Sequence, residues 1–390
     1  MTDQGWLRER LEEFERIYRP SASEGEREAA EWIVERLAEV GAEARIEAEP
    51  AHGTYWWPLG IGAALGAISG LAALRGRRFL GAALGALGAA GIADDFPPGK
   101  RRLRRPLPQR TAYNVVCEIG PADAERTMVV VSHHDAAHSG LVFHPALPKF
   151  ADRLGLIEGQ DTSPALMAPV IGGPILAALG ALTGSRLLAR LGVVLGVGSA
   201  AAMADIGMRK TVPGANDNGT GVVALLALAR RLAEDPLENL RVILLSAGAE
   251  ESFSEGIKAF GERHFPRLAR ESTFFLAVDS IGSPHLLVLR GEGFLKMREY
   301  SPRALEMMDG LAEELGIWLY PNLRLHNGTD GLEPLAAGYE TAALCGCTDL
   351  KNPANYHWPN DVAENVEFGT LADGIRLIEA AARRLDERWL

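Results

Sequence analysis

Histidine and carboxylate side chains recur in this chain at points where short apolar runs end. His133 and Asp135 follow the apolar run at 129–131. A histidine at a strand end can bind a metal ion through one ring nitrogen. A carboxylate two residues further on can then fix the tautomer through the other ring N–H. This pair therefore predicts one part of a metal site.

Four more carboxylates, at three places in the chain, are candidate metal ligands or bases. Asp217 lies in a Gly- and Asn-rich turn, residues 214–221, whose glycines let the backbone approach a ligand closely. Glu250 and Glu251 follow a second apolar run, and Asp279 ends a third. Because adjacent residues point in different directions, one glutamate of the pair can bind a metal ion while the other faces its bound water.

A second histidine, His357, stands in a Pro- and Asn-rich loop with Asp361 four residues further on. Taken singly, each of these residues could have a purely structural role, and the glutamate pair could simply begin an exposed helix. Together, the set favours a metal centre, since ligands of open α/β sheets gather outside the carboxyl ends of the strands. Five O and N ligands, with one carboxylate shared and another left as a base, suit two zinc ions about 3.5–4 Å apart. The remaining histidines, His134, His138 and His144, are expected to be packing or loop residues.

The elements that position these residues alternate between strands and helices. Nearly continuous apolar strands favour an α/β fold with a mixed, mostly parallel sheet covered by helices on both faces. Strands are expected at 113–119, 128–131, 241–245, 273–278, 285–289 and 341–344. Helices are expected at about 6–17, 23–40, 219–232, 304–315 and 371–385, the second beginning with a capping box of Ser23 and Glu26.

Two apolar regions interrupt this alternation, and each is expected to form a helical hairpin. The uncharged runs 56–74 and 162–185 have the length of a spanning helix, whereas 79–93 and 187–204 are marginal. Small residues recur at four-residue spacing, which favours close helix packing in lipid. We expect hairpins at 55–98 and 161–208 to cross a membrane, separating catalytic segments 1–54, 99–160 and 209–390. The alternative is a pair of hairpins buried in a soluble core or an oligomer interface.

The charge and cysteine content of the chain argue against some classes of partner and site. The 40 basic and 51 acidic side chains give a net charge of -11, which argues against nucleic acid. The three cysteines are too few for a disulfide framework or a four-cysteine zinc site, and we expect free thiols. The charged start of the chain does not have the pattern of a secretory signal peptide.

As an ordered set, these motifs resemble the co-catalytic zinc aminopeptidase family, which also contains glutamate carboxypeptidases and glutaminyl cyclases. The resemblance covers about 1–50, 109–140 and 211–390. It implies a zinc exopeptidase-like fold. The stretches that match are 114–116, 129–135, 214–221, 249–251, 279–282, Asp330 and 356–361.

The resemblance also implies a ligand set for two zinc ions. One ion would be held by His133, Asp217 and Asp279. The other would be held by Asp217, which bridges both ions, together with Glu251 and His357. The sequence departs from the family pattern in three ways: members are commonly exported but no signal-peptide pattern is visible here, and two apolar insertions interrupt the chain. The insertions are expected to wall the site and affect substrate size and access.

By the same resemblance, Glu250 would be the general base and Asp135 would orient His133. The implied activity is that of an aminopeptidase, which hydrolyses the N-terminal residues of peptides through a water bridging two zinc ions. Two alternatives are a glutaminyl-cyclase-like single-zinc aminoacyl transferase and a non-catalytic membrane scaffold with a peptidase-like domain.

The hairpins also predict a topology and a location. Each hairpin returns to the side from which it starts, so the catalytic segments lie together on one side. Basic residues near the helix ends favour the cytoplasmic side for them. We therefore expect a multi-pass membrane protein that contacts lipid and a peptide substrate and is able to form oligomers. Eleven basic residues lie on the catalytic side, namely Arg45, Lys100, Arg101, Arg102, Arg104, Arg105, Arg110, Lys149, Arg153, Arg209 and Lys210, against five at the hairpin tips, Arg75, Arg77, Arg78, Arg186 and Arg190.

Overall fold

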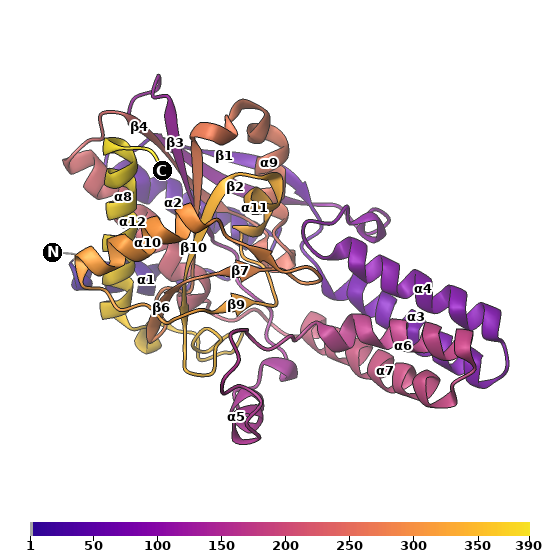
Figure 1. Cartoon of the computed structure of the whole chain (residues 1–390). Coiled ribbons are helices and arrows are strands. Elements are labelled where there is room, and N and C mark those ends of the chain that lie inside the picture. The colour runs from indigo at the N-terminus through magenta and orange to yellow at the C-terminus, as the bar shows by residue number, and fades with distance from the viewer. Residues whose placement is uncertain (1–2) are drawn as a thin grey trace.

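A computed structural model describes residues 3–390 of the chain. It consists of an α/β body and a four-helix bundle that projects from one side of it (Figure 1). The body is built on a seven-stranded sheet in the order β1-β2-β4-β3-β5-β10-β6. The strands are β1 (Ala44–Ala51), β2 (Arg110–Ile119), β3 (Arg126–His133), β4 (Leu240–Ala247), β5 (Thr273–Asp279), β6 (His285–Val288) and β10 (Glu340–Cys347).

The central strands β4, β3, β5 and β10 are parallel, while β1, β2 and β6 pair antiparallel with their neighbours. The expected α/β fold with a mixed sheet is therefore confirmed. A small second sheet consists of β7 (Gly291–Glu292), β8 (Arg298–Glu299) and β9 (Arg324–Leu325).

Helices cover both faces of the main sheet, and the period-2 alternation of the strands explains why. On β3, Met128 and Val130 join one buried cluster, whereas Val129 and Val131 join another. The first cluster packs under α1 (Gln4–Phe14), α2 (Glu24–Glu39), α8 (Thr220–Glu234), α10 (Pro302–Leu315) and α12 (Phe368–Glu387). The second packs under α9 (Glu255–His264) and α11 (Leu332–Ala337).

Every expected strand and helix of the body is present, with ends that differ by a few residues. Strand β1 and helices α9 and α11 were not among the expected elements, and neither was the short helix α5 (Ala146–Arg153). β1 lies at the sheet edge and carries charged residues and a proline, which obscure its strand pattern.

The two apolar regions form the four-helix bundle, in which α3 (Trp56–Leu74) and α4 (Arg78–Asp95) pack on α6 (Ala168–Thr183) and α7 (Arg186–Met208). The glycines let the backbones approach closely. A Cβ atom on Gly192 would lie 2.5 Å from the backbone nitrogen of Ala177. The hairpins are thus joined into one bundle and are not enclosed by the body, contrary to a soluble-core arrangement within this chain (Figure 1).

The lengths of the bundle helices correct one expectation. Among the described residues, α3 and α7 are long and apolar enough to cross a membrane, whereas α6 has only 16 residues. The uncharged run at 162–185 is longer than its helix because α6 begins only at Ala168. The run at 187–204, expected to be marginal, lies within the 23-residue helix α7.

Candidate metal centre

The predicted site residues meet at the carboxyl edge of the parallel strands. His133 is the last residue of β3 and Asp279 the last of β5. The pair Glu250–Glu251 follows β4, and His357 lies in the loop after β10. Asp217 lies in the turn that leads into α8. Because parallel strands end at the same edge, loops far apart in the sequence converge here.

Asp217 lies between the two histidines. Its Oδ1 atom is 3.2 Å from Nε2 of His133, and its Oδ2 atom is 3.4 Å from Nε2 of His357. Oδ2 of Asp279 lies 3.9 Å from Nε2 of His133, and Oε2 of Glu251 lies 3.2 Å from Nε2 of His357. The side chains therefore form two groups of three potential ligands that share Asp217, with the ligand atoms of each group within 4.8 Å of one another.

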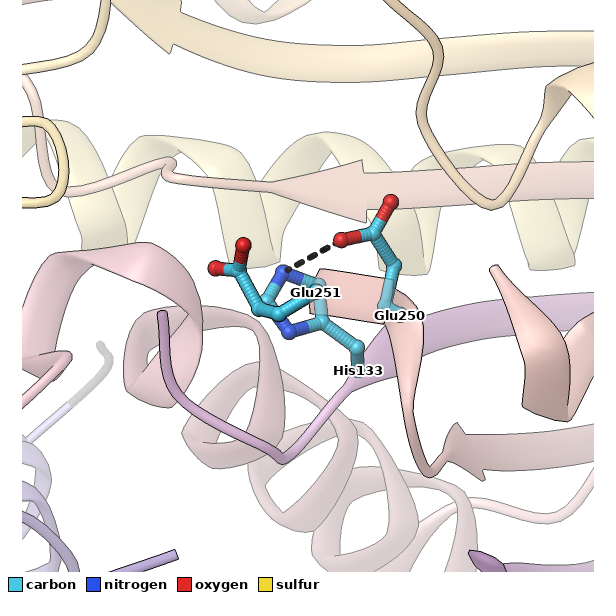
Figure 2. A group of neighbouring side chains, drawn as sticks. All are labelled: His133, Glu250 and Glu251. Carbon is cyan, nitrogen blue, oxygen red and sulfur yellow. Dashed lines mark ion pairs between the residues drawn. The ribbon is translucent and has the colours of Figure 1, made fainter. Parts of the chain in front are cut away.

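Glu250 and Glu251 point in different directions, as Figure 2 shows. Oε2 of Glu250 lies 4.0 Å from Nε2 of His133, whereas Glu251 reaches His357. Glu250 also lines the cavity beside the site, and the Ser254 hydroxyl donates a hydrogen bond to its Oε1 atom at 3.2 Å. Glu251 thus completes the ligand group of Asp217 and His357, while Glu250 lies on the side of His133, with which it and Glu251 form a further possible group. Both glutamates line the cavity in which a substrate would lie.

Asp135 holds both the histidine and the glutamate pair. The Nδ1 atom of His133 lies 3.2 Å from the Asp135 backbone oxygen and 3.5 Å from its Oδ1 atom. The same carboxylate accepts hydrogen bonds of 3.0 Å from each of the backbone N–H groups of Glu250 and Glu251. The hydroxyl of Ser21 donates a further bond of 2.6 Å to it. Asp135 therefore fixes the relative position of the loops after β3 and β4.

Glu26 has a role that its sequence context did not indicate. The Ser23 hydroxyl caps α2 as expected, but the Glu26 carboxylate does not complete a capping box on the Ser23 backbone. It is fully buried and accepts hydrogen bonds from the N–H groups of Ala22, Tyr113 and Ala249. Glu26 thus supports the turn just before the glutamate pair.

Two further buried carboxylates surround the site. Asp361 accepts hydrogen bonds from the N–H groups of Asn216 and Asp217, at 2.7 and 3.1 Å, and so fixes the turn that carries Asp217. Asp330 is buried, and neither of its carboxylate oxygens has a hydrogen-bond partner. Burial raises the pKa of Asp330 to about 8, His133 opposes this shift, and the charge of Asp135 adds to it. Asp330 therefore interacts electrostatically with the site.

The pKa values of the site residues are shifted because several buried carboxylates lie close together. Burial and the neighbouring Asp217 raise the pKa of Asp279 to about 6, and burial raises that of Glu250 well above its usual value. Burial opposes the charged form of His357, but Glu251 and Asp217 raise its pKa to about 10. Such a cluster of buried carboxylates is stabilised by cations placed among them.

The donor set fits zinc. It consists of two imidazole nitrogens and several carboxylate oxygens, the ligand types that zinc takes in catalytic sites. The Oε1 atom of Glu251 is buried without a hydrogen-bond partner, which leaves it free to bind a cation. His134, in contrast, lies outside the groups of potential ligands, with its Nδ1 atom 3.0 Å from Ser246 Oγ.

A cavity of about 500 Å³ opens beside the site. Its lining is largely apolar, and residues at 142–151 and 163–166, in the segment that links β3 to the bundle, form one wall. Only Ser163, Pro164 and Leu166 of this wall belong to the expected hairpin regions, because residues 142–151 lie in the segment assigned to the body. The expectation that the two apolar insertions wall the site is therefore met only at the start of the second one. The apolar lining includes Phe143, Leu147, Leu166, Leu287, Leu289, Leu323, Leu325 and Leu350.

The fold and the donor set together define a zinc exopeptidase-like α/β protein. Residues 201–382 match the model of Peptidase family M28, which confirms the resemblance to the zinc aminopeptidases and glutaminyl cyclases. No curated protein matches the chain by sequence.

Solved structures share the fold at low sequence identity. Glutaminyl cyclase from Tannerella forsythia has a TM-score of 0.59 and 14% identity, with 97% of this chain and 98% of that chain covered. The aminopeptidase from Aneurinibacillus sp. strain AM-1 has a TM-score of 0.57 and 14% identity, with 98% and 93% covered. A zinc aminopeptidase from Bacillus subtilis has a TM-score of 0.56 and 14% identity, with 98% and 95% covered. The fold is thus common to peptidases and cyclases.

Proposed function

We propose that this protein is a zinc-dependent exopeptidase of the aminopeptidase type, with two metal ions. The observation that carries this proposal is the position of Asp217, whose two carboxylate oxygens each face one histidine. A carboxylate in this position could bridge two cations, and each group around it contains three potential ligands.

In this proposal, the zinc ions supply Lewis acidity, which lowers the pKa of a water molecule and polarises the scissile carbonyl. The Glu250 carboxylate, which faces the cavity, takes a proton from the attacking water and gives it to the departing amine. Asp135 keeps His133 in the required tautomer and holds the Glu250 backbone in place. The Oδ1 atom of Asn327, buried at the cavity wall without a partner, is a candidate acceptor for the substrate's α-ammonium group.

Two other functions compete with this one. A glutaminyl cyclase would need one zinc ion and no second group of ligands, so the presence of both groups favours the peptidase. A non-catalytic scaffold would need neither the ligands nor Glu250. Zinc stoichiometry therefore separates the three: two ions, one ion or none.

The test uses the full-length protein purified in detergent. We expect about two zinc ions per chain by elemental analysis, and release of N-terminal residues from short peptides and aminoacyl anilides. Peptides with an N-terminal glutamine test the cyclase alternative. One zinc ion together with pyroglutamate formation would replace the proposal with the cyclase.

We further propose that the bundle anchors the protein in a membrane. Large apolar side chains point outward from all four helices, and α3 and α7 have spanning length. Trp57, at the start of α3, is 59% exposed at the end of the bundle nearest the body, where an interfacial aromatic residue is favoured. Recovery of the protein in the soluble fraction without detergent would contradict this proposal and favour an oligomer interface.

We also propose that the body lies on the cytoplasmic side of the membrane. Of the eleven basic residues counted on that side, Arg101 and Arg104 are buried, so they are not available to lipid headgroups and the excess over the hairpin tips is smaller. Protease treatment of intact and permeabilised cells tests the orientation. Cleavage of the body only after permeabilisation is the expected result.

A further inference from the structure

The turn at 248–255, which carries Glu250 and Glu251, has an unfavourable backbone. Ala249, Phe253 and Ser254 have φ values of 52°, 72° and 55°. Residues with a Cβ atom are disfavoured in this left-handed region, so the surroundings must hold the turn in place.

The turn is held from two sides. From the body, Asp135 and Glu26 accept the N–H groups of residues 249–251. From the opposite side, Nη1 of Arg104 donates a hydrogen bond of 2.6 Å to the Ser252 carbonyl oxygen. Arg101 donates to the next carbonyl oxygen, that of Phe253. These two arginines lie in the segment that follows α4, so this half of the support comes from the exit of the first hairpin.

Arg104 is itself fixed by a buried ion-pair network. It is completely buried, and its Nε and Nη2 atoms donate to the two oxygens of Asp95 at 2.8 and 2.9 Å. Its Nη1 atom also lies 3.3 Å from Oε1 of Glu255, at the end of the turn. Such bidentate, charge-assisted pairs impose a defined geometry as well as binding energy. Asp95 is the last residue of α4, so the network joins the bundle to the turn.

Glu255 brings the entrance of the same hairpin to this point. Its carboxylate accepts hydrogen bonds from the N–H groups of His52 and Gly53, which precede α3, and from the Ser252 hydroxyl. The Phe253 ring packs on Tyr55 at a centroid distance of 4.7 Å. Both ends of the hairpin therefore converge on the turn.

From this geometry we infer that Arg104 is a positioning residue for the Glu250–Glu251 pair, acting through the Ser252 carbonyl and tying the catalytic turn to the base of the bundle. The inference rests on the proposed function, because it concerns the carboxylates of the same site. Arg104 touches neither the cavity nor the ligand groups, so its effect is transmitted by the backbone of the turn.

The test compares Arg104→Lys and Asp95→Asn with the control Arg102→Ala in the full-length protein in detergent. Arg102 lies two residues from Arg104 and pairs with Asp94 at 2.9 Å, but it is 58% exposed. For both test variants we expect kcat to fall about 10- to 100-fold with KM nearly unchanged, and zinc to be lost to a chelator at correspondingly lower concentrations. The control should match the wild type.

Hydrogen exchange of the metal-free protein gives a readout that does not depend on activity. The amides of residues 249–255 should exchange faster in both test variants, while those of the strands keep their wild-type protection. Folded test variants with wild-type exchange in the turn and wild-type kcat would overturn the inference. If the wild type neither binds zinc nor cleaves peptides, the proposed function fails, and the exchange measurement still decides whether Arg104 holds the turn.

Discussion

The metal centre and the four-helix bundle are built by different physical means. At the candidate metal centre, buried carboxylates such as Asp135, Glu26 and Asp361 each accept two or more hydrogen bonds from backbone N–H groups. In the bundle, helices meet through small residues, and large apolar side chains such as Leu182 and Val194 point outward. The first region depends on the placement of a few atoms, whereas the second depends on backbone proximity and, in the proposed membrane anchor, on an apolar environment. Mutations should therefore affect the two regions in distinct ways.

The largest effect is expected for Asp217→Ala. Removing the shared carboxylate leaves each group with two ligands, so we expect loss of both zinc ions and a fall of activity to background. The bundle should be unaffected, and the protein should stay in the membrane fraction. Elemental analysis and an anilide assay test this, with Asp373→Asn, an exposed carboxylate of α12, as the control. Retention of one firmly bound zinc ion would show that Asp217 is not shared.

Glu250→Gln should have the next largest effect. The amide keeps the shape of the side chain and one acceptor oxygen but cannot take up a proton. We expect kcat to fall by about 10²–10⁴-fold, the usual contribution of a general base, while zinc content stays at the wild-type level. A variant that hydrolyses anilides at the wild-type rate would exclude Glu250 as the base. Loss of zinc would instead make it a ligand.

The same contrast explains what could be predicted from the sequence. The ligand candidates could be predicted because the strands of a parallel sheet end at a common edge. His133, Asp279 and the residues after β4 therefore had to lie close together.

The roles of Glu26 and Arg104 could not be predicted, because their partners are brought near only by the folded chain. The partners of Glu26 are backbone N–H groups, and those of Arg104 are the Ser252 carbonyl oxygen and the carboxylates of Asp95 and Glu255. The sequence pattern instead places Glu26 in a helix cap and Arg104 among the basic residues near lipid.

The bundle was predictable in part for a related reason. Hydrophobic runs and repeated glycines indicate helices and close packing, and each hairpin formed where it was expected. The sequence did not specify which helices would meet, because a stripe of small residues fits many partners. The length of α6 was overestimated, since uncharged residues 162–167 are not helical.

A pair of glycines on α7 tests the packing of the bundle. A Cβ atom on Gly196 would lie 2.7 Å from the backbone nitrogen of Ala67, whereas a Cβ on Gly198 would have no atom within 4 Å. Gly196→Val should destabilise the bundle by about 1–3 kcal/mol through overpacking, and Gly198→Val should not. Thermal unfolding in detergent measures the difference. Equal midpoints for the two variants would contradict the helix packing described here.

The smallest effect concerns the cavity lining, to which the loop after β10 contributes Leu350. Leu350 lines the cavity, and its replacement by alanine removes apolar contact from a bound substrate side chain. A loss of about 1–2 kcal/mol of contact corresponds to a fall of about 5- to 30-fold in kcat/KM for leucyl anilide. Alanyl anilide should be nearly unaffected, because its side chain does not fill the apolar space. Leu154→Ala is the control, since Leu154 is also a leucine close to the cavity wall, in the segment 142–166, but is 58% exposed and does not line the cavity. Equal losses for the two substrates would mean that Leu350 supports the fold of the loop, and that the apolar cavity does not receive the N-terminal side chain.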